Sequence, residues 1–211
     1  MTERLEVLYS LIGSGKTFAD VGCDHGYISK AVLDNNKFEK VILSDVSEKS
    51  LEKAKELLSQ YGDKVEFIAC DGFLGYTTTP DEAIIAGMGG EEIIKILSES
   101  KMPESLVLAP QKNTEKVRKF LLENGYRLEK DFTFYTAGKF YDAILAKIGS
   151  DEYSPMEVIF GRDNLKQKPQ AFIKKIQAEI DLLNGVVESD ASQLNKERAK
   201  LRLAILKGIL K

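Results

Sequence analysis

Short apolar segments alternate with helical segments over the first 125 residues, and this alternation restricts the fold more than any other feature of the chain. Strands that alternate with helices indicate a mostly parallel sheet with helices on both faces. Short, continuously apolar strands are typical of such a sheet, because both of their faces are buried. The predicted strands are Thr17–Val21, Lys40–Ser44, Val65–Ala69, Ala83–Ala86 and Leu106–Ala109.

The segments between these strands have helical periodicity. Apolar residues recur at i, i+3, i+4 and i+7 from Leu5 to Ile12, so an amphipathic helix precedes the first strand. Ser47 is a suitable N-cap for a longer helix whose apolar face runs from Leu51 to Tyr61. Further helices are predicted over Tyr27–Asp34, Glu91–Leu97 and Thr114–Leu122.

Two strand-like runs, Arg127–Tyr135 and Phe140–Ile148, follow the alternating region. The link around Ala137-Gly138 is too short for a helical crossover, so the two strands are expected to form an antiparallel hairpin. Five parallel strands followed by a hairpin are more specific than a general Rossmann-like pattern. The ordinary dinucleotide-binding fold ends with another parallel strand instead.

Residues 151–211 contain no strand signal. Apolar residues from Ile173 to Val187 step by three and four, as in a coiled coil, and Leu194, Leu201 and Ile205 continue on a second helix. We expect an antiparallel helical hairpin, and hence two domains, 1–150 and 151–211. Periodicity alone is equally consistent with a packing or dimerisation role for this hairpin.

The net charge of −3 conceals an asymmetry between these two parts. Residues 1–150 contain 19 Lys and Arg against 24 Asp and Glu, whereas residues 151–211 contain 11 against 9. The total excludes a strongly basic nucleic-acid coat. The basic arm can nevertheless contact phosphates, and the candidate residues for RNA binding are Lys166, Lys174, Lys175, Arg198 and Arg202.

Several classes of protein are disfavoured. No apolar stretch approaches the roughly 20 residues that cross a bilayer, and the first residues lack an apolar signal core. Cys23 and Cys70 are the only cysteines and show no disulfide-like framework, so we predict free thiols and a cytoplasmic protein. One His and two Cys make a metal centre improbable.

Gly13-Ser14-Gly15-Lys16-Thr17 resembles the end of a phosphate-binding P-loop. The full pattern requires a glycine where this chain has Ser10, and the segment precedes a strand rather than a helix. We therefore interpret it as a plain turn.

The turn after the first strand, from Asp20 to Tyr27, is the first candidate binding site. Gly22 and Gly26 allow a ligand to approach the backbone, and the following helix presents free N–H groups. Asp20 and Asp24 would repel a pyrophosphate but suit a cationic cofactor such as S-adenosylmethionine.

The carboxyl ends of the other strands carry further candidates. Asp45 can accept both hydroxyl groups of a ribose, and Asp71-Gly72 lies where a cofactor adenine would sit. Ala86-Gly87-Met88-Gly89-Gly90 implies backbone that is closely approached. In Ala109-Pro110-Gln111, Pro110 ends a strand and Gln111 can hydrogen-bond a base or the cofactor.

Four segments together resemble the bacterial tRNA adenine-N1-methyltransferases (TrmK-like), namely Asp20–Tyr27, Ile85–Gly90, Ala109–Gln111 and Gly138–Tyr141. The resemblance covers the whole chain, and Ala-Gly-Met-Gly-Gly is its most specific part. It implies a class I methyltransferase fold, S-adenosylmethionine as cofactor, and methylation of N1 of the adenine at tRNA position 22. One departure is Cys23, where Thr or Ser is expected.

The resemblance also implies roles for individual residues. Asp24 is a candidate for stabilising the cationic product, His25 for orienting the base or accepting a proton, and Gln111 for contacting the base. Cofactor contacts are expected from Ala86, Gly87 and Met88 in addition to the strand-end residues above. Contacts with the tRNA are expected from Tyr27, Gly89, Gly90, Pro110 and Tyr141, with a monomer slightly favoured.

The sequence has two alternative interpretations. An NAD-dependent oxidoreductase is disfavoured because the chain lacks Gly-x-Gly-x-x-Gly and ends its sheet with a hairpin. A non-catalytic RNA-binding module with the same fold stays open, since binding motifs do not require turnover.

Overall fold

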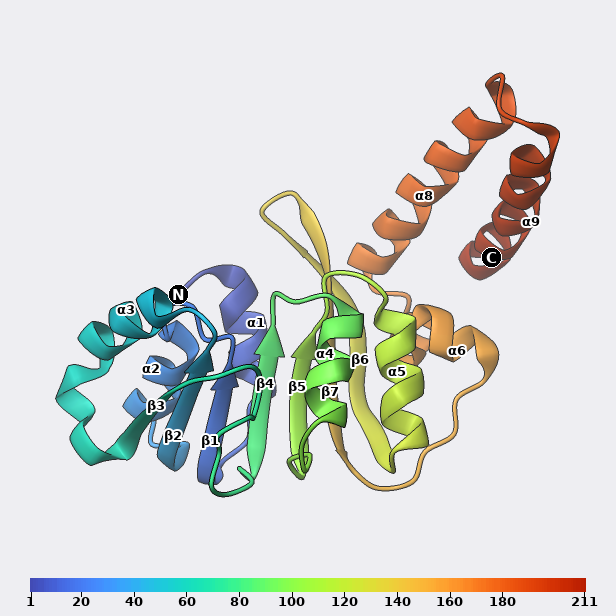
Figure 1. The fold of residues 1–211 in the computed structure, drawn as a ribbon. Helices are drawn as coiled ribbons and strands as arrows, with labels where there is room; N and C mark the ends of the chain where they lie inside the picture. The colour runs from blue at the N-terminus through green and yellow to red at the C-terminus, as the bar shows by residue number, and fades with distance from the viewer.

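A single seven-stranded sheet forms the centre of the computed structural model, which describes all residues from 1 to 211 (Figure 1). The strand order is β3-β2-β1-β4-β5-β7-β6. β1 to β5 are parallel, and β7 pairs antiparallel with both β5 and β6. This confirms the predicted five parallel strands and terminal hairpin. The strands are β1 (Gly15–Val21), β2 (Phe38–Asp45), β3 (Val65–Ala69), β4 (Glu82–Ala86), β5 (Ser105–Ala109), β6 (Tyr126–Thr136) and β7 (Lys139–Ile148).

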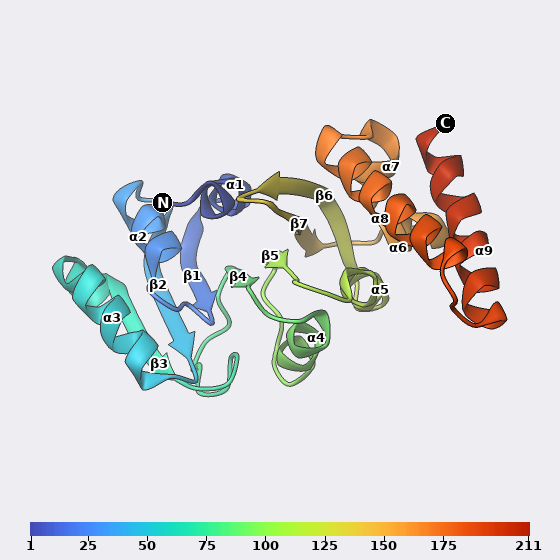
Figure 2. The same cartoon turned by 90° about the horizontal axis from the view of Figure 1, so that it is seen from above.

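Helices cover both faces of this sheet, as Figure 2 shows. One face carries α1 (Glu3–Leu11), α2 (Tyr27–Asp34) and α3 (Glu48–Leu58), which continues into the short 3-10 helix η1 (Ser59–Lys64). The other face carries α4 (Gly90–Ser98) and α5 (Thr114–Glu123). None of the helices in the structure is both long and apolar enough to span a membrane.

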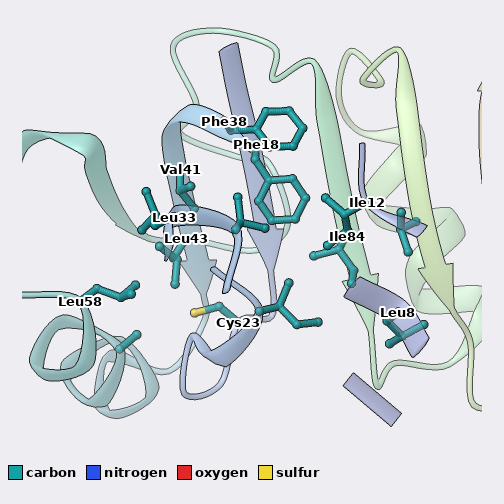
Figure 3. Packing of buried hydrophobic residues seen from close by; sticks show 14 of the residues in the cluster. Leu8, Ile12, Phe18, Cys23, Leu33, Phe38, Val41, Leu43, Leu58 and Ile84 are labelled. Carbon is teal, nitrogen blue, oxygen red and sulfur yellow. The ribbon is translucent and has the colours of Figure 1, made fainter. Parts of the chain in front are cut away.

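The alternation of side chains along each strand divides the core into two layers. Phe18 and Ile84 face α1 to α3, whereas their neighbours Ala19 and Ile85 face α4 and α5. Figure 3 shows the first layer, in which Leu8 of α1 and Ile12, the C-cap of that helix, lie beside Ile84. The predicted apolar face of the first helix is therefore its buried face.

Four helices follow the hairpin, namely α6 (Pro155–Phe160), α7 (Arg162–Gln167), α8 (Gln170–Glu188) and α9 (Gln193–Leu210). The sequence predicted α8 and α9 but missed the two short helices. α6 begins at a capping box in which the side chains of Ser154 and Glu157 bond to each other's backbone N–H. α8 and α9 project beyond the edge of the sheet at which β4 ends (Figure 1).

A buried ion pair between α5 and β6 also bonds to the C-terminal region. The side chains of Arg118 on α5 and Asp131 on β6 are 2% and 1% exposed. Arg118 Nε donates to both carboxylate oxygens of Asp131, at 2.8 and 2.9 Å. Its Nη1 donates to the carbonyl oxygens of Val158 and Ile159 in α6, each at 3.2 Å.

The contact between α8 and α9 differs in part from the predicted seam. Ile176 and Ile180 of α8 are buried as expected, but Leu201 of α9 is 70% exposed and Leu194 and Ile205 are also exposed. The buried face of α9 is formed instead by Ala199, Leu203, Leu206 and Ile209. Both the exposed face and the buried face of α9 thus carry apolar residues. The sequence pattern alone does not distinguish them, and the contact with α8 determines which face is buried.

Exchanging one leucine on each face of α9 tests this orientation. Leu206→Ala should lower the free energy of unfolding by about 2–5 kcal/mol, because Leu206 is fully buried. Leu201→Ala is the matched control and should change it by less than about 0.5 kcal/mol. Urea denaturation followed by circular dichroism measures both. Equal losses for the two variants would contradict the described orientation.

Candidate functional site

A pocket of about 460 Å³ opens at the carboxyl ends of β1, β2 and β4. The connections from β1 and β4, which are neighbours in the sheet, lead to helices on opposite faces, and such a switch point is where open α/β sheets bind ligands. The structure brings ten of the predicted residues together in the lining, namely Asp20, Gly22, Asp24, His25, Tyr27, Asp45, Ala86, Gly87, Met88 and Gln111.

Asp20 is the most buried carboxylate of this pocket. Its side chain accepts a hydrogen bond from Ser29 Oγ at 2.7 Å and forms no ion pair with Lys or Arg. Burial raises the pKa of Asp20 to about 7, and repulsion from Asp45 acts in the same direction. A cationic group bound beside Asp20 would stabilise the ionised form of this carboxylate, which burial disfavours.

Asp45 is fixed at the end of β2 by two backbone contacts. One of its carboxylate oxygens accepts from the N–H of Ser47 at 2.8 Å, and the other accepts from the N–H of Asp24 at 3.3 Å. Asp24 has a φ of 48°, an unusual value for a residue other than glycine. The turn after β1 is therefore held against the end of β2.

His25 has a partner at each ring nitrogen. Nδ1 lies 2.9 Å from Oδ1 of Asp24, and Nε2 lies 3.2 Å from Nζ of Lys53. A lysine ammonium can only donate, so Nε2 accepts and Nδ1–H donates to Asp24. The ring also stacks on Tyr27, with centroids 5.7 Å apart and an interplanar angle of 10°. In this arrangement His25 orients Asp24 and has no free nitrogen for a proton.

Two glycines line the pocket, and their bare sides differ, since that of Gly22 is filled by Met88 and that of Gly87 is open. A Cβ on Gly22 would lie 2.2 Å from the terminal methyl group of Met88, and the φ of Gly22 is 69°. The bare side of Gly87 faces side-chain donors, since Nε2 of Gln111 lies 3.9 Å from the position that a Cβ would occupy. Any larger residue at position 22 would displace Met88.

Three predicted cofactor contacts, Gly26, Asp71 and Gly72, are outside the pocket lining. A Cβ on Gly26 would lie 3.1 Å from Leu43, and one on Gly72 would lie 2.6 Å from Ile96. The structure thus gives both glycines a packing role. Asp71, the third residue outside the lining, pairs with Lys95 at 2.8 Å.

Four predicted substrate contacts also lie outside the pocket lining, namely Gly89, Gly90, Pro110 and Tyr141. A Cβ on Gly90 would lie 2.6 Å from the carbonyl oxygen of Asn113 and 2.8 Å from that of Lys112. The loop after β5 is thus the group that approaches this glycine-rich segment. Pro110 is buried, and Tyr141 stacks on Phe134 with centroids 5.5 Å apart.

Sequence reasoning missed six residues of the lining, namely Thr2, Arg4, Leu5, Cys23, Ile28 and Ile84. Three of them belong to the beginning of α1 or its cap, and the amphipathic pattern of that helix predicted only its buried face. Cys23 and Cys70 are free thiols, as predicted. Burial raises the pKa of the Cys23 thiol, which therefore stays protonated at neutral pH.

The predicted RNA contacts divide into two groups. Lys166, Lys174 and Arg198 are exposed and form no ion pair. Nζ of Lys175 lies 2.9 Å from Asp142 of β7, and Nε of Arg202 lies 2.7 Å from Glu179 of α8. Lys175 and Arg202 thus hold α8 and α9 in place, a structural role that sequence reasoning did not assign to them.

A second groove of about 220 Å³ runs between the loop after β5 and the helices α8 and α9. Its lining includes Lys112, Lys175 and Arg202. Gln111 lines both this groove and the larger pocket, so the two cavities meet at its side chain.

Asp20→Asn should remove a pH-dependent cost in folding stability. The pKa of Asp20 is higher in the folded state than its ordinary value, so the folded state binds more protons between about pH 4 and 7. Ionisation of Asp20 then destabilises the protein as pH rises through this window. Relative to wild type, Asp20→Asn should gain about 2 kcal/mol between pH 5 and pH 8. Urea unfolding at the two pH values measures this, and a pH-independent difference would argue against it.

Comparison with known proteins agrees with this architecture. The family model of a methyltransferase domain matches residues 1–144. A "putative tRNA methyltransferase" of Mycoplasma pneumoniae is 31% identical, over 67% of this chain and 68% of that protein. The tRNA (adenine(22)-N(1))-methyltransferase of Bacillus subtilis is 26% identical, over 100% of this chain and 97% of that protein.

A solved structure shows the same fold over the full length. It is a "putative tRNA (m1A22) methyltransferase" of Streptococcus pneumoniae in complex with S-adenosyl-L-methionine, 25% identical, with a TM-score of 0.90 and complete coverage of both chains. Sheet order, terminal hairpin and helical C-terminus are thus shared with a methyltransferase. The chain belongs to the methyltransferase-domain family and, within it, to the TrmK-like tRNA (adenine-22)-N1-methyltransferases.

Proposed function

We propose that this protein transfers a methyl group from S-adenosylmethionine to N1 of the adenine at position 22 of tRNA. The observation that carries the proposal is the pocket at the β1–β4 switch point of a TrmK-like sheet, lined by three carboxylates. Its volume of about 460 Å³ is within the range of about 300–1,000 Å³ typical of small-molecule sites.

The donor set of the pocket fits this cofactor. Asp20, which no Lys or Arg neutralises, suits the ammonium and sulfonium charges. Asp45, held at the end of β2, is placed to accept the ribose hydroxyls. When bound, S-adenosylmethionine supplies a methyl group that is already activated by a positive sulfur. Gly87 leaves the backbone at the end of β4 accessible, and Met88 packs against Gly22 in the same lining.

Most of the catalytic effect can come from alignment, which contributes about 7–11 kcal/mol in well-oriented systems. Adenine N1 has a free lone pair, so no group of the protein has to remove a proton before attack. N1 is on the pairing edge, however, and the base has to be unpaired or flipped out to react. Tyr27, half exposed at the mouth of the pocket, offers a ring on which that base can pack.

Asp24, His25 and Gln111 are the polar groups available to the base. Methylation makes the adenine cationic, and the exposed carboxylate of Asp24 can stabilise that charge. Its Nδ1–H bond from His25 sets the orientation of the carboxylate. The amide of Gln111 can bond to the edge of the base where the two cavities meet.

The remaining part of the proposal concerns how the tRNA is held. We assign the chemistry to residues 1–150 and the additional tRNA contacts to residues 151–211. The groove from Gln111 toward α8 and α9 supports this division, as does the exposure of Lys166, Lys174 and Arg198. A monomer is sufficient, because one chain supplies the whole lining of the pocket. A tRNA substrate fits a cytoplasmic location.

Unmodified tRNA tests the reaction directly. Incubation with S-adenosylmethionine should produce N1-methyladenosine in a transcript that carries adenine 22, and none in the same transcript with guanine at position 22. Nucleoside analysis by mass spectrometry measures the product. Binding of both tRNA and cofactor without any methylated nucleoside would favour the non-catalytic RNA-binding alternative.

Neutralising exposed cations of the C-terminal region should weaken tRNA binding alone. The variant Lys166→Gln, Lys174→Gln, Arg198→Gln should lower the slope of log affinity against log salt by about two. Its affinity for S-adenosylhomocysteine should stay unchanged, because none of the three residues lines the pocket.

A charge-matched control separates a local contact from net charge. Lys16→Gln, Lys64→Gln, Lys101→Gln removes three exposed cations from other parts of the chain and should leave the salt dependence close to that of wild type. Equal weakening by the two triple variants, or parallel loss of cofactor affinity, would contradict the proposed division of labour.

A further inference from the structure

The pocket contains one side chain whose chemistry the proposed roles leave unused. Arg4 of α1 is the only Lys or Arg among the sixteen residues of the lining, which also includes three Asp. Its Nε is buried and has no hydrogen-bond partner. A buried donor without a partner costs about 1–3 kcal/mol, so a feature of this kind needs a reason.

The position of Arg4 is fixed from three sides. Leu8, one turn further along α1, is fully buried in the core. Glu3 accepts a hydrogen bond from Thr136 Oγ1 at the end of β6, at 2.5 Å. The guanidinium carbon of Arg4 lies 5.1 Å from the centroid of the Tyr141 ring, in a cation–π contact.

Two donors converge above Gly87 as a result. Nη2 of Arg4 lies 3.6 Å from the position that a Cβ on Gly87 would occupy, and Nε2 of Gln111 lies 3.9 Å from the same point. Gly87 has a φ of 93° and leaves this space free. The arrangement is therefore suited to an acceptor that carries two oxygens, above all a carboxylate or a phosphate.

S-adenosylmethionine carries both positive and negative groups, and these suit different residues of the pocket. Its sulfonium and ammonium groups suit the carboxylates, but its own carboxylate is repelled by Asp20, Asp24 and Asp45. Arg4 is the only Lys or Arg in the lining. It lies over the end of β4, one strand away from Asp20, and so at the side of the pocket opposite Asp45 on β2.

We propose that Arg4 binds the carboxylate of the methionine part of the cofactor, with Nε2 of Gln111 as the second donor, which leaves the amide oxygen of Gln111 for the edge of the base. This inference rests on the proposed function, since it takes S-adenosylmethionine as the ligand. It makes α1 a part of the cofactor site in addition to its place in the core.

The test compares two ligands that differ only in the carboxylate, S-adenosylhomocysteine and S-adenosyl-3-thiopropylamine. Wild type should bind the first about 10- to 100-fold more tightly in isothermal titration calorimetry, as expected for a charge-assisted bond. Arg4→Met should abolish that preference while affinity for the amine stays close to wild type. Arg4→Lys, which keeps the charge, should retain part of the preference. Arg127→Met is the matched control, since Arg127 lies outside the pocket, and should retain all of it.

Three results would overturn the assignment. Wild type without a preference for the carboxylate ligand would do so, as would equal loss of both ligands in Arg4→Met and Arg4→Lys. An intact preference in Arg4→Met together with a raised KM for tRNA would assign the guanidinium to an RNA phosphate instead. Failure of wild type to bind S-adenosylhomocysteine at all would reject the proposed function itself, and is distinguishable from these outcomes.

Discussion

The buried ion pair between Arg118 and Asp131 determines how the C-terminal helices lie relative to the pocket. Charges removed from water are costly unless they are paired and fully hydrogen-bonded. Asp131 satisfies Arg118 Nε, and the carbonyl oxygens of Val158 and Ile159 satisfy its Nη1. These carbonyls belong to α6, so if the chain after the sheet left in another direction, the Nη1 group of the buried Arg118 would lose both of these acceptors. The path of α6 and α7 then directs α8 and α9 to the edge at which the pocket opens.

Gly161 shows how closely the connection between α6 and α7 packs against the ion pair. It connects α6 to α7 with a φ of 87°, and a Cβ there would lie 3.0 Å from both Arg118 Nη2 and Asp131 Oδ1. The sequence offered no sign of this arrangement, because an Arg and an Asp far from any motif are ordinarily solvated. The two short helices were missed for the same reason. Their six residues each are too few to show periodicity, and their stability comes from contacts with α5 and β6.

The strands and the acidic side of the site were predictable, because local pattern determines both. Strand burial shows in short apolar runs, and parallel strands end at one edge, so Asp20 and Asp45 had to meet there. Glycines were less informative. Gly22 and Gly87 border the pocket, but Gly26 and Gly72 meet side chains of the core. A missing Cβ makes room for a ligand and for the chain's own packing alike, and only tertiary structure distinguishes the two.

The loops after β4 and β5 are bonded to each other along their whole length. Gln111 N–H donates to the carbonyl of Met88 at 2.9 Å, and Gly90 N–H donates to that of Lys112 at 2.9 Å. Met88 lines the pocket proposed for the cofactor, and Gln111 lines both that pocket and the groove toward α8 and α9. These bonds couple the positions of the two loops, so a backbone shift in one loop would also move the other. In the proposed site, a substitution in either loop that shifts this backbone would therefore alter the binding of the base and of the methyl donor together.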